Sequence, residues 1–292
     1  MAEQQTVIVT GGAGLIGTHL IKLLLAKEYR VVSIDNYFIG SKANHVEGAE
    51  YVEGHTKDIE ALLGHENPSI IFHLGEYSRV EQSFEDLELV WQSNVHGAHC
   101  VFEYWRKRGC KLVYAGSSTK FSDGGLGRDQ SPYAWMKASN TELVRNYGNW
   151  FKLPYAITYF YNAYGEQELA TGQYASVIGR FKTQFFEGKP ITVVSPGTQK
   201  RNFTFAGDIA KGLLMVGEGG QGDDYGLGSH ESHTVLEIAQ MFGGEITLLP
   251  ERQGNRMDSI CDTSRAEKEF GWKAEQTVEQ YIEALKKSHT VH

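Results

Sequence analysis

The feature that most constrains the fold is a glycine-rich turn between an apolar strand and a helix. Residues 6–10 form an apolar, β-branched run typical of a buried strand. Gly11-Gly-Ala-Gly-Leu-Ile-Gly17 follows, and a helical pattern extends over 15–27. Glycines here permit a tight turn and close approach of the backbone to a pyrophosphate, and the helix N-terminus offers unpaired N–H groups to it. The turn therefore predicts a dinucleotide-binding site.

An acidic residue ends the second predicted strand, which covers 30–34. Asp35 follows it, 18 positions after Gly17. A carboxylate at this place accepts hydrogen bonds from both ribose hydroxyls and repels a 2′-phosphate, so we expect NAD rather than NADP. Lys42 is the nearest cation that argues for NADP.

Strand and helix patterns alternate along the first half of the chain. Further strands are expected at 69–74, 111–116 and 155–160, and further helices at 57–63, 85–108 and 132–150. This alternation predicts a Rossmann-type, doubly wound parallel α/β sheet, in which ligands bind beyond the carboxyl ends of the strands.

The pattern loosens beyond residue 165. We expect a short strand at 191–194 and helices at 173–187 and 277–287. The sequence thus predicts an NAD-binding domain over 1–165 and a smaller C-terminal α/β lobe over 166–292 that mainly binds substrate. It leaves open whether segments of the lobe return to the first domain.

Composition narrows the class of protein. A net charge of −8 disfavours binding to nucleic acid or to an anionic membrane surface, and no apolar run reaches membrane-spanning length. The first strand begins almost at once, so we expect no signal peptide. Three dispersed cysteines indicate reduced thiols in a cytoplasmic protein, and the eleven histidines show no spacing that predicts a metal site.

A tyrosine and a lysine lie four residues apart in Tyr133-Ala-Trp-Met-Lys137, with Ser117-Ser-Thr119 upstream. At this spacing on a helix the two side chains share one face. Ser131-Pro132 supplies an N-cap and a first-turn proline, which places Tyr133 in the opening turn. An ammonium group near a phenol stabilises the phenolate, so the pair can exchange a proton with a substrate hydroxyl. A tyrosine and a lysine at this spacing also occur by chance in unrelated chains. The presence of the nucleotide-binding motif in the same chain supports a catalytic role for this pair.

Together these motifs resemble the extended short-chain dehydrogenase/reductase family, specifically its nucleotide-sugar epimerases and dehydratases of the UDP-glucose 4-epimerase type. The resemblance covers nearly the whole chain and also rests on His73-Leu74, Asn94-Val-His-Gly97, Tyr161-Asn-Ala-Tyr-Gly165, Arg201-Asn-Phe-Thr-Phe205 and Asp262-Thr-Ser-Arg-Ala266 before Gly271-Trp272.

The resemblance implies a set of site residues. NAD would contact Gly11, Gly14, Leu15, Ile16, Gly17, Asp35, Asn36, Asp58, Leu74 and Lys137, and the diphosphate of a nucleotide sugar would contact Asn162, Arg201 and Arg252. The catalytic set would be Tyr133, Lys137, Ser117 and Thr119. The family also implies a homodimer packed through helices 85–108 and 132–150.

Some positions depart from the family pattern. His55 takes the place of an Asp that is common near the adenine, with Asp58 three positions later, and adenine contact by either stays open. Gly75 and Glu76 stand where small alanines are common. The loop from Ser117 to Tyr133 spans only 16 positions and is shorter than in many relatives.

The expected first step is shared by two reactions. Tyr133 takes the proton of a sugar hydroxyl while the hydride of that carbon passes to NAD, and Ser117 hydrogen-bonds the same hydroxyl. A 4-epimerase then returns the hydride to the opposite face of the 4-keto sugar.

A 4,6-dehydratase requires additional acid and base groups. Ser118 and Thr119 cannot serve as bases at neutral pH, which favours epimerisation. Lys120 or Glu76 would take the extra role in a dehydratase. A non-catalytic NAD-binding regulator is a third class, and the presence of both Tyr133 and Lys137 argues against it.

Overall fold

The computed structural model describes residues 4–121, 123–251 and 261–290. Its centre is a seven-stranded parallel sheet. The strand order is β11 (Gly222–Leu227), β6 (Tyr155–Phe160), β5 (Lys111–Ser117), β4 (Ile70–His73), β1 (Thr6–Thr10), β2 (Arg30–Asp35) and β3 (Glu50–Glu53). Strands β1 to β3 are added toward one edge of the sheet and β4 to β6 toward the other, and this change of strand order between β1 and β4 places a crevice at the carboxyl ends of the strands.

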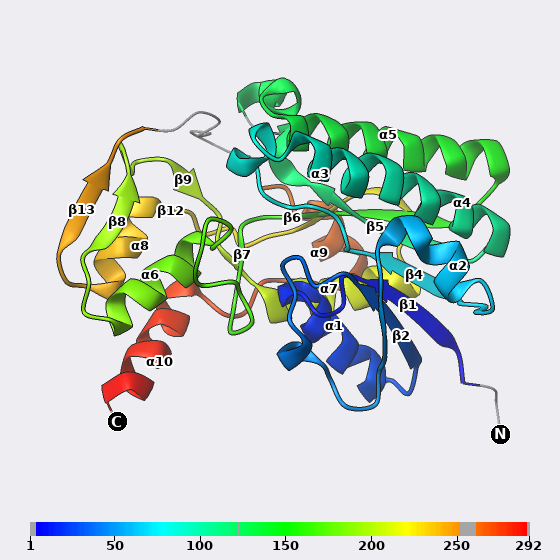
Figure 1. Cartoon of the computed structure of the whole chain (residues 1–292), viewed down its shortest axis with the longest axis horizontal. Helices are drawn as coiled ribbons and strands as arrows, with labels where there is room; N and C mark the ends of the chain where they lie inside the picture. Colours follow the sequence, from blue (N-terminus) through cyan, green and yellow to red (C-terminus); the bar gives the residue numbers. More distant parts are fainter. Residues whose placement is uncertain (1–3, 122, 252–260, 291–292) are drawn as a thin grey trace.

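Helices cover both faces of this sheet (Figure 1). One face carries α1 (Leu15–Ala26), α7 (Ala206–Gly219) and α9 (Ser264–Phe270), and the other carries α2 (Ile59–Leu63), α3 (Leu87–Trp91), α4 (Ala98–Arg108) and α5 (Pro132–Phe151). Because side chains alternate along a strand, Val7 and Val9 pack with the first group while Ile8 packs with the second.

A smaller lobe lies on the left of Figure 1, at the other side of the molecule from the N-terminus. In it β8 (Ile191–Val194) pairs in parallel with β13 (Ile246–Leu249), and helices α6 (Val177–Phe186), α8 (Val235–Phe242) and α10 (Val278–Thr290) surround a core that includes Phe181, Ile238, Phe242 and Ile282. Two short pairs connect the lobe to the sheet domain, namely β7 (Ala163–Tyr164) with β10 (Thr204–Phe205), and β9 (Lys200–Arg201) with β12 (His233–Thr234).

The large sheet and its helices confirm the predicted fold class, although helices α7 and α9 on one face of the sheet were not predicted. Other elements differ from the prediction as well. Strands β3 and β11 were not predicted, and β11 brings a segment of the C-terminal half into the large sheet. The helix expected over 85–108 contains a π-helical segment at Gln92–Gly97 between α3 and α4. Among the described residues no helix combines the length and hydropathy required to cross a bilayer.

Candidate active site

A cavity of about 560 Å³ lies where the carboxyl ends of the sheet strands face the smaller lobe. Most of the predicted site residues line it: Gly11, Gly14, Leu15, Ile16, Gly17, Asp35, Asn36, Leu74, Ser117, Thr119, Tyr133, Lys137, Asn162 and Arg201. Arg252 lies outside the described residues. The tertiary structure therefore gathers segments from both halves of the chain around one space.

The glycine turn is shaped for close approach by a ligand. Gly11 has a φ of +73°, and a Cβ there would lie 2.8 Å from the Cα of Gly75. A Cβ on Gly17 would lie 2.3 Å from the carbonyl oxygen of Gly11. Gly14 caps α1 without a side-chain hydrogen bond, so the first N–H groups of the helix remain available at the cavity wall. These features fit a pyrophosphate, as expected.

Asp35 ends β2 with its carboxylate held by backbone groups. Oδ2 accepts a hydrogen bond from the N–H of Ala13 at 2.9 Å, and Oδ1 accepts one from the N–H of Tyr37 at 2.8 Å. Burial raises the pKa of Asp35, and these two backbone N–H groups oppose the rise. Each oxygen retains a lone pair, so the carboxylate can accept the two hydroxyls of a ribose.

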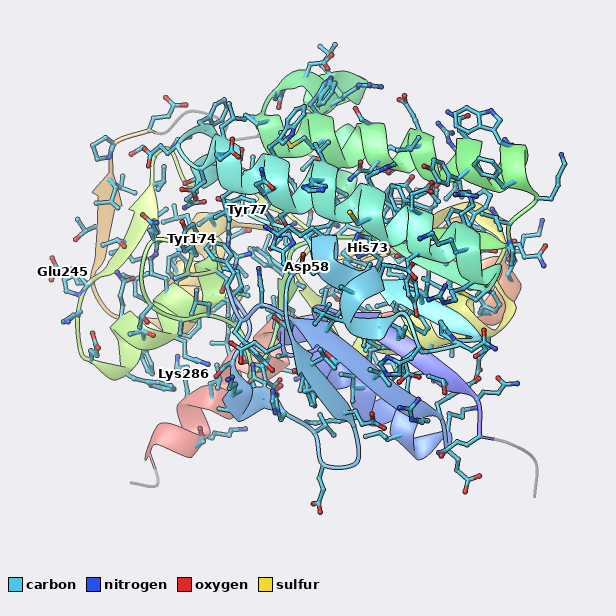
Figure 2. All side chains as sticks on the ribbon, turned by 45° about the vertical axis from the view of Figure 1, so that its right-hand side comes forward. Asp58, His73, Tyr77, Tyr174, Glu245 and Lys286 are labelled. Atoms are coloured by element: carbon cyan, nitrogen blue, oxygen red, sulfur yellow. The ribbon has the colours of Figure 1, made fainter. Side chains whose placement is uncertain are left out.

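Of the two residues considered for contact with the adenine, only one lines the cavity. His55 caps the short turn Thr56–Asp58, where its Nδ1 accepts a hydrogen bond from the N–H of Lys57 at 3.1 Å, and it lines the cavity. Asp58 is exposed and does not line the cavity. His55 thus lies closer to the predicted adenine end than Asp58 does, and Figure 2 places Asp58 on the sheet domain.

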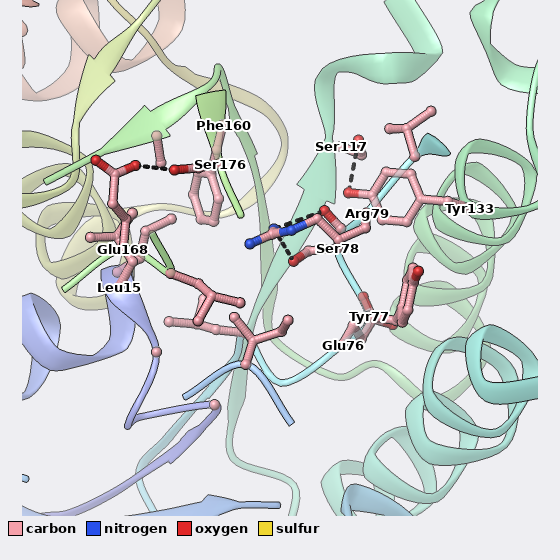
Figure 3. Close-up of a pocket in the computed structure, with 18 of the residues that line it drawn as sticks. Leu15, Glu76, Tyr77, Ser78, Arg79, Ser117, Tyr133, Phe160, Glu168 and Ser176 are labelled. Atoms are coloured by element: carbon pink, nitrogen blue, oxygen red, sulfur yellow. Dashed lines mark hydrogen bonds between the residues drawn. The ribbon is translucent and has the colours of Figure 1, made fainter. Parts of the chain in front are cut away.

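Three hydroxyl groups form a chain in the cavity wall. Ser131 accepts a hydrogen bond from the N–H of Ala134 at 3.1 Å and starts α5, which places Tyr133 in its first turn as predicted. The hydroxyl of Tyr133 donates to Ser117 Oγ at 3.3 Å (Figure 3). The hydroxyl of Thr119 donates to the same oxygen at 2.9 Å. The backbone N–H of Thr119 also donates to Ser117 Oγ, at 3.3 Å. Because Ser117 Oγ is the acceptor in all of these contacts, its own proton is left to be donated into the cavity.

Lys137 lies one turn below Tyr133 and forms a buried ion pair with Glu76. Its ammonium also donates to the carbonyl of Ala115 and lies 4.4 Å from the centre of the Tyr114 ring. Glu76 Oε2 also accepts a hydrogen bond from the hydroxyl of Tyr114 at 3.0 Å, and Oε1 accepts one from Nδ2 of Asn140 at 2.9 Å. The lysine expected beside the cofactor is therefore already held by a carboxylate.

The loop after β4 is fastened by the π-helical segment. Asn94 is fully buried, and its side chain accepts from the N–H of Tyr77 at 2.7 Å and donates to the carbonyl of Tyr77 at 2.9 Å. Because Asn94 bonds both the N–H and the carbonyl of Tyr77, it fixes the backbone of the loop that carries Glu76 and Arg79 at this residue. π-helical turns often occur at functional sites, and here the turn aims Asn94 at the loop.

Four charged cavity residues were not predicted: Arg79, Glu81, Glu168 and Arg180. Arg79 lies in the loop after β4, and Glu168 precedes α6 (Figure 3). Burial raises the pKa of Glu168 to about 7, while a hydrogen bond from Ser176 opposes the rise. The only signal for Arg79 in the sequence is its place shortly after a strand that ends at the ligand-binding edge. Glu168 lies in an irregular segment that gives no such signal.

The predicted diphosphate residues come from the connections between sheet and lobe. Asn162 follows β6 with a φ of +38°, and its Nδ2 donates to the carbonyl of Asn202 at 3.5 Å. Arg201 lies on β9 and donates to the carbonyl of Lys200 at 2.8 Å. Both line the cavity, at the end where the lobe meets the sheet.

One group of metal-ligating side chains occurs among the described residues. Ligand atoms of Glu231, His233 and Glu279 lie within 4.8 Å of one another on the smaller lobe. His233 Nε2 is 3.0 Å from Glu279 Oε1, so the histidine already has an acidic partner. None of the three lines the cavity.

Comparison with known proteins gives a consistent set of similarities. The family model described as "NAD dependent epimerase/dehydratase family" matches residues 7–228. A putative UDP-glucose 4-epimerase of Methanocaldococcus jannaschii is 28% identical, with 96% of each chain covered. A dTDP-glucose 4,6-dehydratase of Xanthomonas campestris is 24% identical over 95% of this chain and 91% of the relative.

Among solved structures, the UDP-glucose 4-epimerase of Thermus thermophilus in complex with NAD superimposes with a TM-score of 0.90. It is 25% identical, and the match covers 98% of this chain and 99% of that one. The similarity therefore extends over both the sheet domain and the smaller lobe.

Proposed function

Because the chain belongs to the NAD dependent epimerase/dehydratase family, we propose that it is an NAD-dependent 4-epimerase of a nucleotide-linked hexose. Members of the family are enzymes, and NAD is their cofactor. The finer assignment rests mainly on one observation: Glu76, a carboxylate that a dehydratase could use, has both oxygens engaged by other protein groups.

The chain supplies a dinucleotide-shaped cradle for NAD. The glycine turn and the N-terminus of α1 would hold the pyrophosphate, and Asp35 would hold the adenosine ribose. When bound, NAD takes a hydride from the sugar carbon and later returns it. Since the hydride is borrowed and returned, we expect the cofactor to stay bound through the cycle.

Proton transfer falls to the hydroxyl chain in the cavity. Tyr133 would take the proton of the C4 hydroxyl, and Ser117 would donate a hydrogen bond to the same oxygen. Thr119 orients Ser117 by donating to its Oγ. Lys137 supplies a positive charge one turn away on the same helix, which stabilises the tyrosinate.

The choice between epimerisation and 4,6-dehydration depends on additional acid and base groups. After the hydroxyl proton, a dehydratase must remove a further proton, this time from a carbon atom. An epimerase needs only to turn the keto sugar so that the hydride returns to its opposite face. Glu76 is 3% exposed and bonded to Lys137, Tyr114 and Asn140, so it is poorly suited to act on a substrate. The side chain of Lys120 lies outside what the structure describes, so dehydration through Lys120 is the second candidate.

The diphosphate of the substrate would bind at the lobe end of the cavity. Arg201 and Asn162 line that end, and a guanidinium matches phosphate oxygens in shape and charge. We also assign Arg252 to this group, as the family resemblance implies.

The test is a panel of UDP-, dTDP-, GDP- and CDP-hexoses incubated with the wild type and with Tyr133→Phe. An epimerase yields a product of unchanged mass with a new NMR spectrum, and a dehydratase yields one lighter by a molecule of water. Tyr133→Phe should lower turnover by roughly a hundredfold or more. Tyr147→Phe is the matched control, since it removes a hydroxyl from the same helix that bonds Glu103 outside the cavity at 2.8 Å. Equal turnover by both variants would refute the role of Tyr133.

We further propose a homodimer packed through the helices over 85–108 and 132–150. Val90, Val101 and Phe102 are buried in the core, so they are not available to a partner. Leu87, Trp91 and Trp135 are between 44% and 50% exposed and line one surface hollow beside Pro132. An exposed apolar hollow of this kind is typical of an interface.

Light scattering tests the dimer. Trp135→Glu places a charge in the hollow and should shift the mass to that of a monomer, while Leu248→Glu, at an exposed position on β13, should leave the dimer intact. A wild-type monomer at micromolar concentration contradicts the proposal.

A further inference from the structure

Arg79 is a partly buried cation in the wall of the candidate active site, and the mechanism proposed above gives it no role. It lies in the loop between β4 and α3, in the same cavity as Tyr133 and Ser117. Figure 3 shows its guanidinium projecting between the side carrying Tyr133 and Ser117 and the side carrying Glu168. Its position raises the question of which ligand group it binds.

The protein holds this arginine in a fixed place. Nε donates to the carbonyl of Tyr174 at 2.7 Å, and one terminal nitrogen lies 3.1 Å from Oγ and 3.3 Å from the carbonyl oxygen of Ser78. The bond to Tyr174 ties the loop after β4 to the segment before α6, and the bonds to Ser78 hold the guanidinium within the loop. The guanidinium is therefore ordered before a ligand arrives.

Tyr77 and Tyr174 pack against each other on the two segments that Arg79 joins. The rings of Tyr77 and Tyr174 meet edge to face with centres 6.4 Å apart, and Figure 2 shows both at the junction of the two parts of the molecule. Both hydroxyls donate to Oδ2 of Asp86, each at 2.8 Å. This carboxylate is thus used by the tyrosines, and it is not among the described hydrogen-bond acceptors of Arg79.

Every acceptor that bonds Arg79 among the described residues is a neutral oxygen. Burial lowers the pKa of Arg79, because the charged form is removed from water. Glu168 lines the same cavity and acts electrostatically on Arg79 without forming an ion pair with it among the described contacts. An anionic group on a substrate that displaces water from the cavity would supply the direct ion pair that Arg79 lacks among its described contacts.

A nucleotide sugar offers an anion at two places, the diphosphate and a carboxylate on the hexose. Arg79 lines the same cavity as Tyr133 and Ser117 and lies beside them in Figure 3, which places the arginine at the hexose end of the cavity. Arg201, on β9, lies where the lobe joins the sheet and is the candidate for the diphosphate. The position of Arg79 therefore favours the hexose.

We propose that the substrate is a nucleotide-linked hexuronic acid and that Arg79 binds its carboxylate. This inference rests on the proposed function, and it names the substrate class of the same site. A guanidinium pairs with a carboxylate through two parallel N–H bonds, which orients the ring as well as binding it. Arg79 then acts as the specificity residue that selects an acidic hexose over a neutral one.

The experiment measures binding in NAD-loaded enzyme that carries Tyr133→Phe, so that ligand is not consumed. Calorimetric titrations compare UDP-glucuronic acid with UDP-glucose, which differ only at C6, and repeat the comparison with the dTDP pair. We expect the uronate to bind at least roughly tenfold more tightly, equivalent to about 1.4 kcal/mol. Adding Arg79→Met should abolish this preference while leaving the affinity for the neutral sugar within about threefold, whereas Arg79→Lys should retain part of it.

The outcomes separate the possible roles. Equal weakening of acidic and neutral sugars by Arg79→Met would assign Arg79 to the diphosphate and overturn the inference. A wild-type site without preference for the uronate would also overturn it, and this arm does not depend on the folding of any Arg79 variant. Turnover of neutral nucleotide hexoses by the wild-type enzyme would, in that case, leave the proposed epimerase function standing.

Discussion

Lys137 and Glu76 form an ion pair in the interior of the candidate active site, with only 5% and 3% of their side chains exposed. One partner comes from the first turns of α5 and the other from the loop after β4, 61 positions earlier. Two further donors, Tyr114 and Asn140, bond the carboxylate. The positive charge that would stabilise a tyrosinate is thus balanced by a negative one.

Replacing Glu76 with Gln tests this balance. The variant keeps the shape of the side chain but leaves the ammonium of Lys137 uncompensated, so we expect a loss of about 3 kcal/mol in the free energy of unfolding. The uncompensated charge favours the tyrosinate more strongly, so the acidic limb of the rate profile should move to lower pH. Chemical denaturation and initial rates between pH 5 and pH 9 measure the two effects.

Tyr114→Phe is the control for that variant, because it removes a hydrogen bond to Glu76 without altering charge. Its rate profile should keep the wild-type midpoint. A Glu76→Gln profile that coincides with both others would mean that Glu76 is only structural.

The variants Ser117→Ala and Thr119→Val distinguish the roles of the two hydroxyl groups that precede Tyr133 in the sequence. Ser117 Oγ accepts from both Tyr133 and Thr119, so only its own proton is left for the substrate. Ser117→Ala should lower kcat by roughly a hundredfold, since it removes that donor. Thr119→Val removes only the orienting bond and should cost about tenfold or less. Steady-state kinetics decide the order, and an equal loss in both variants contradicts the assigned roles.

Asp35→Asn tests cofactor selection. The carboxylate keeps one lone pair on each oxygen after bonding Ala13 and Tyr37, and the amide loses one of these acceptors. NAD affinity should fall about tenfold, and discrimination against NADP should decrease because the repelling charge is gone. Glu53→Gln removes an exposed carboxylate from the neighbouring strand, opposite Asp35, and should change neither affinity. Fluorescence titration with both cofactors measures the change.

Glu168→Gln tests the buried carboxyl in the cavity. Burial raises its pKa from 4.5 in the unfolded chain to about 7 in the folded protein. Between these values the folded state holds a proton that the unfolded state has released, so stability falls as pH rises through this window. The full effect above pH 7 is roughly 3 kcal/mol.

The variant should therefore melt at the same temperature as the wild type at pH 4 and at a higher temperature at pH 8. Glu166→Gln, two positions earlier and 53% exposed, provides the control and should show no such divergence. Identical melting curves of wild type and Glu168→Gln at pH 8 would contradict the prediction, because they would show that ionising Glu168 does not destabilise the folded protein.

The parts of the fold that the sequence predicted are those with strong local signals. Strands β1, β2, β4, β5 and β6 are apolar runs buried on both faces, and such runs are recognisable without their partners. The glycine turn and the start of α5 are local as well, since a tight turn and an N-cap depend on neighbouring residues. For that reason most of the predicted NAD and proton-transfer residues lie together in one cavity.

What was missed depends on partners that are distant in the sequence. Strand β11 is glycine-rich and acidic at its start, and pairing with β6 is what makes it a strand. The sequence singled out Glu76 as an unusual residue in place of a small one and as a candidate acid or base of a dehydratase, not as a partner of Lys137. Only the tertiary structure brings its carboxylate to Lys137.

The sequence by itself therefore determined the fold class, the position of the nucleotide turn and the Tyr133–Lys137 pair, because each is encoded by residues within a few positions of one another. The tertiary structure decided the electrostatics of the site. It buried Glu76 against Lys137 and left Arg79 bonded to neutral oxygens alone among the described residues. Charge balance in a cavity is set by groups that meet only after folding, since burial and distance, rather than residue identity, fix how strongly charges interact.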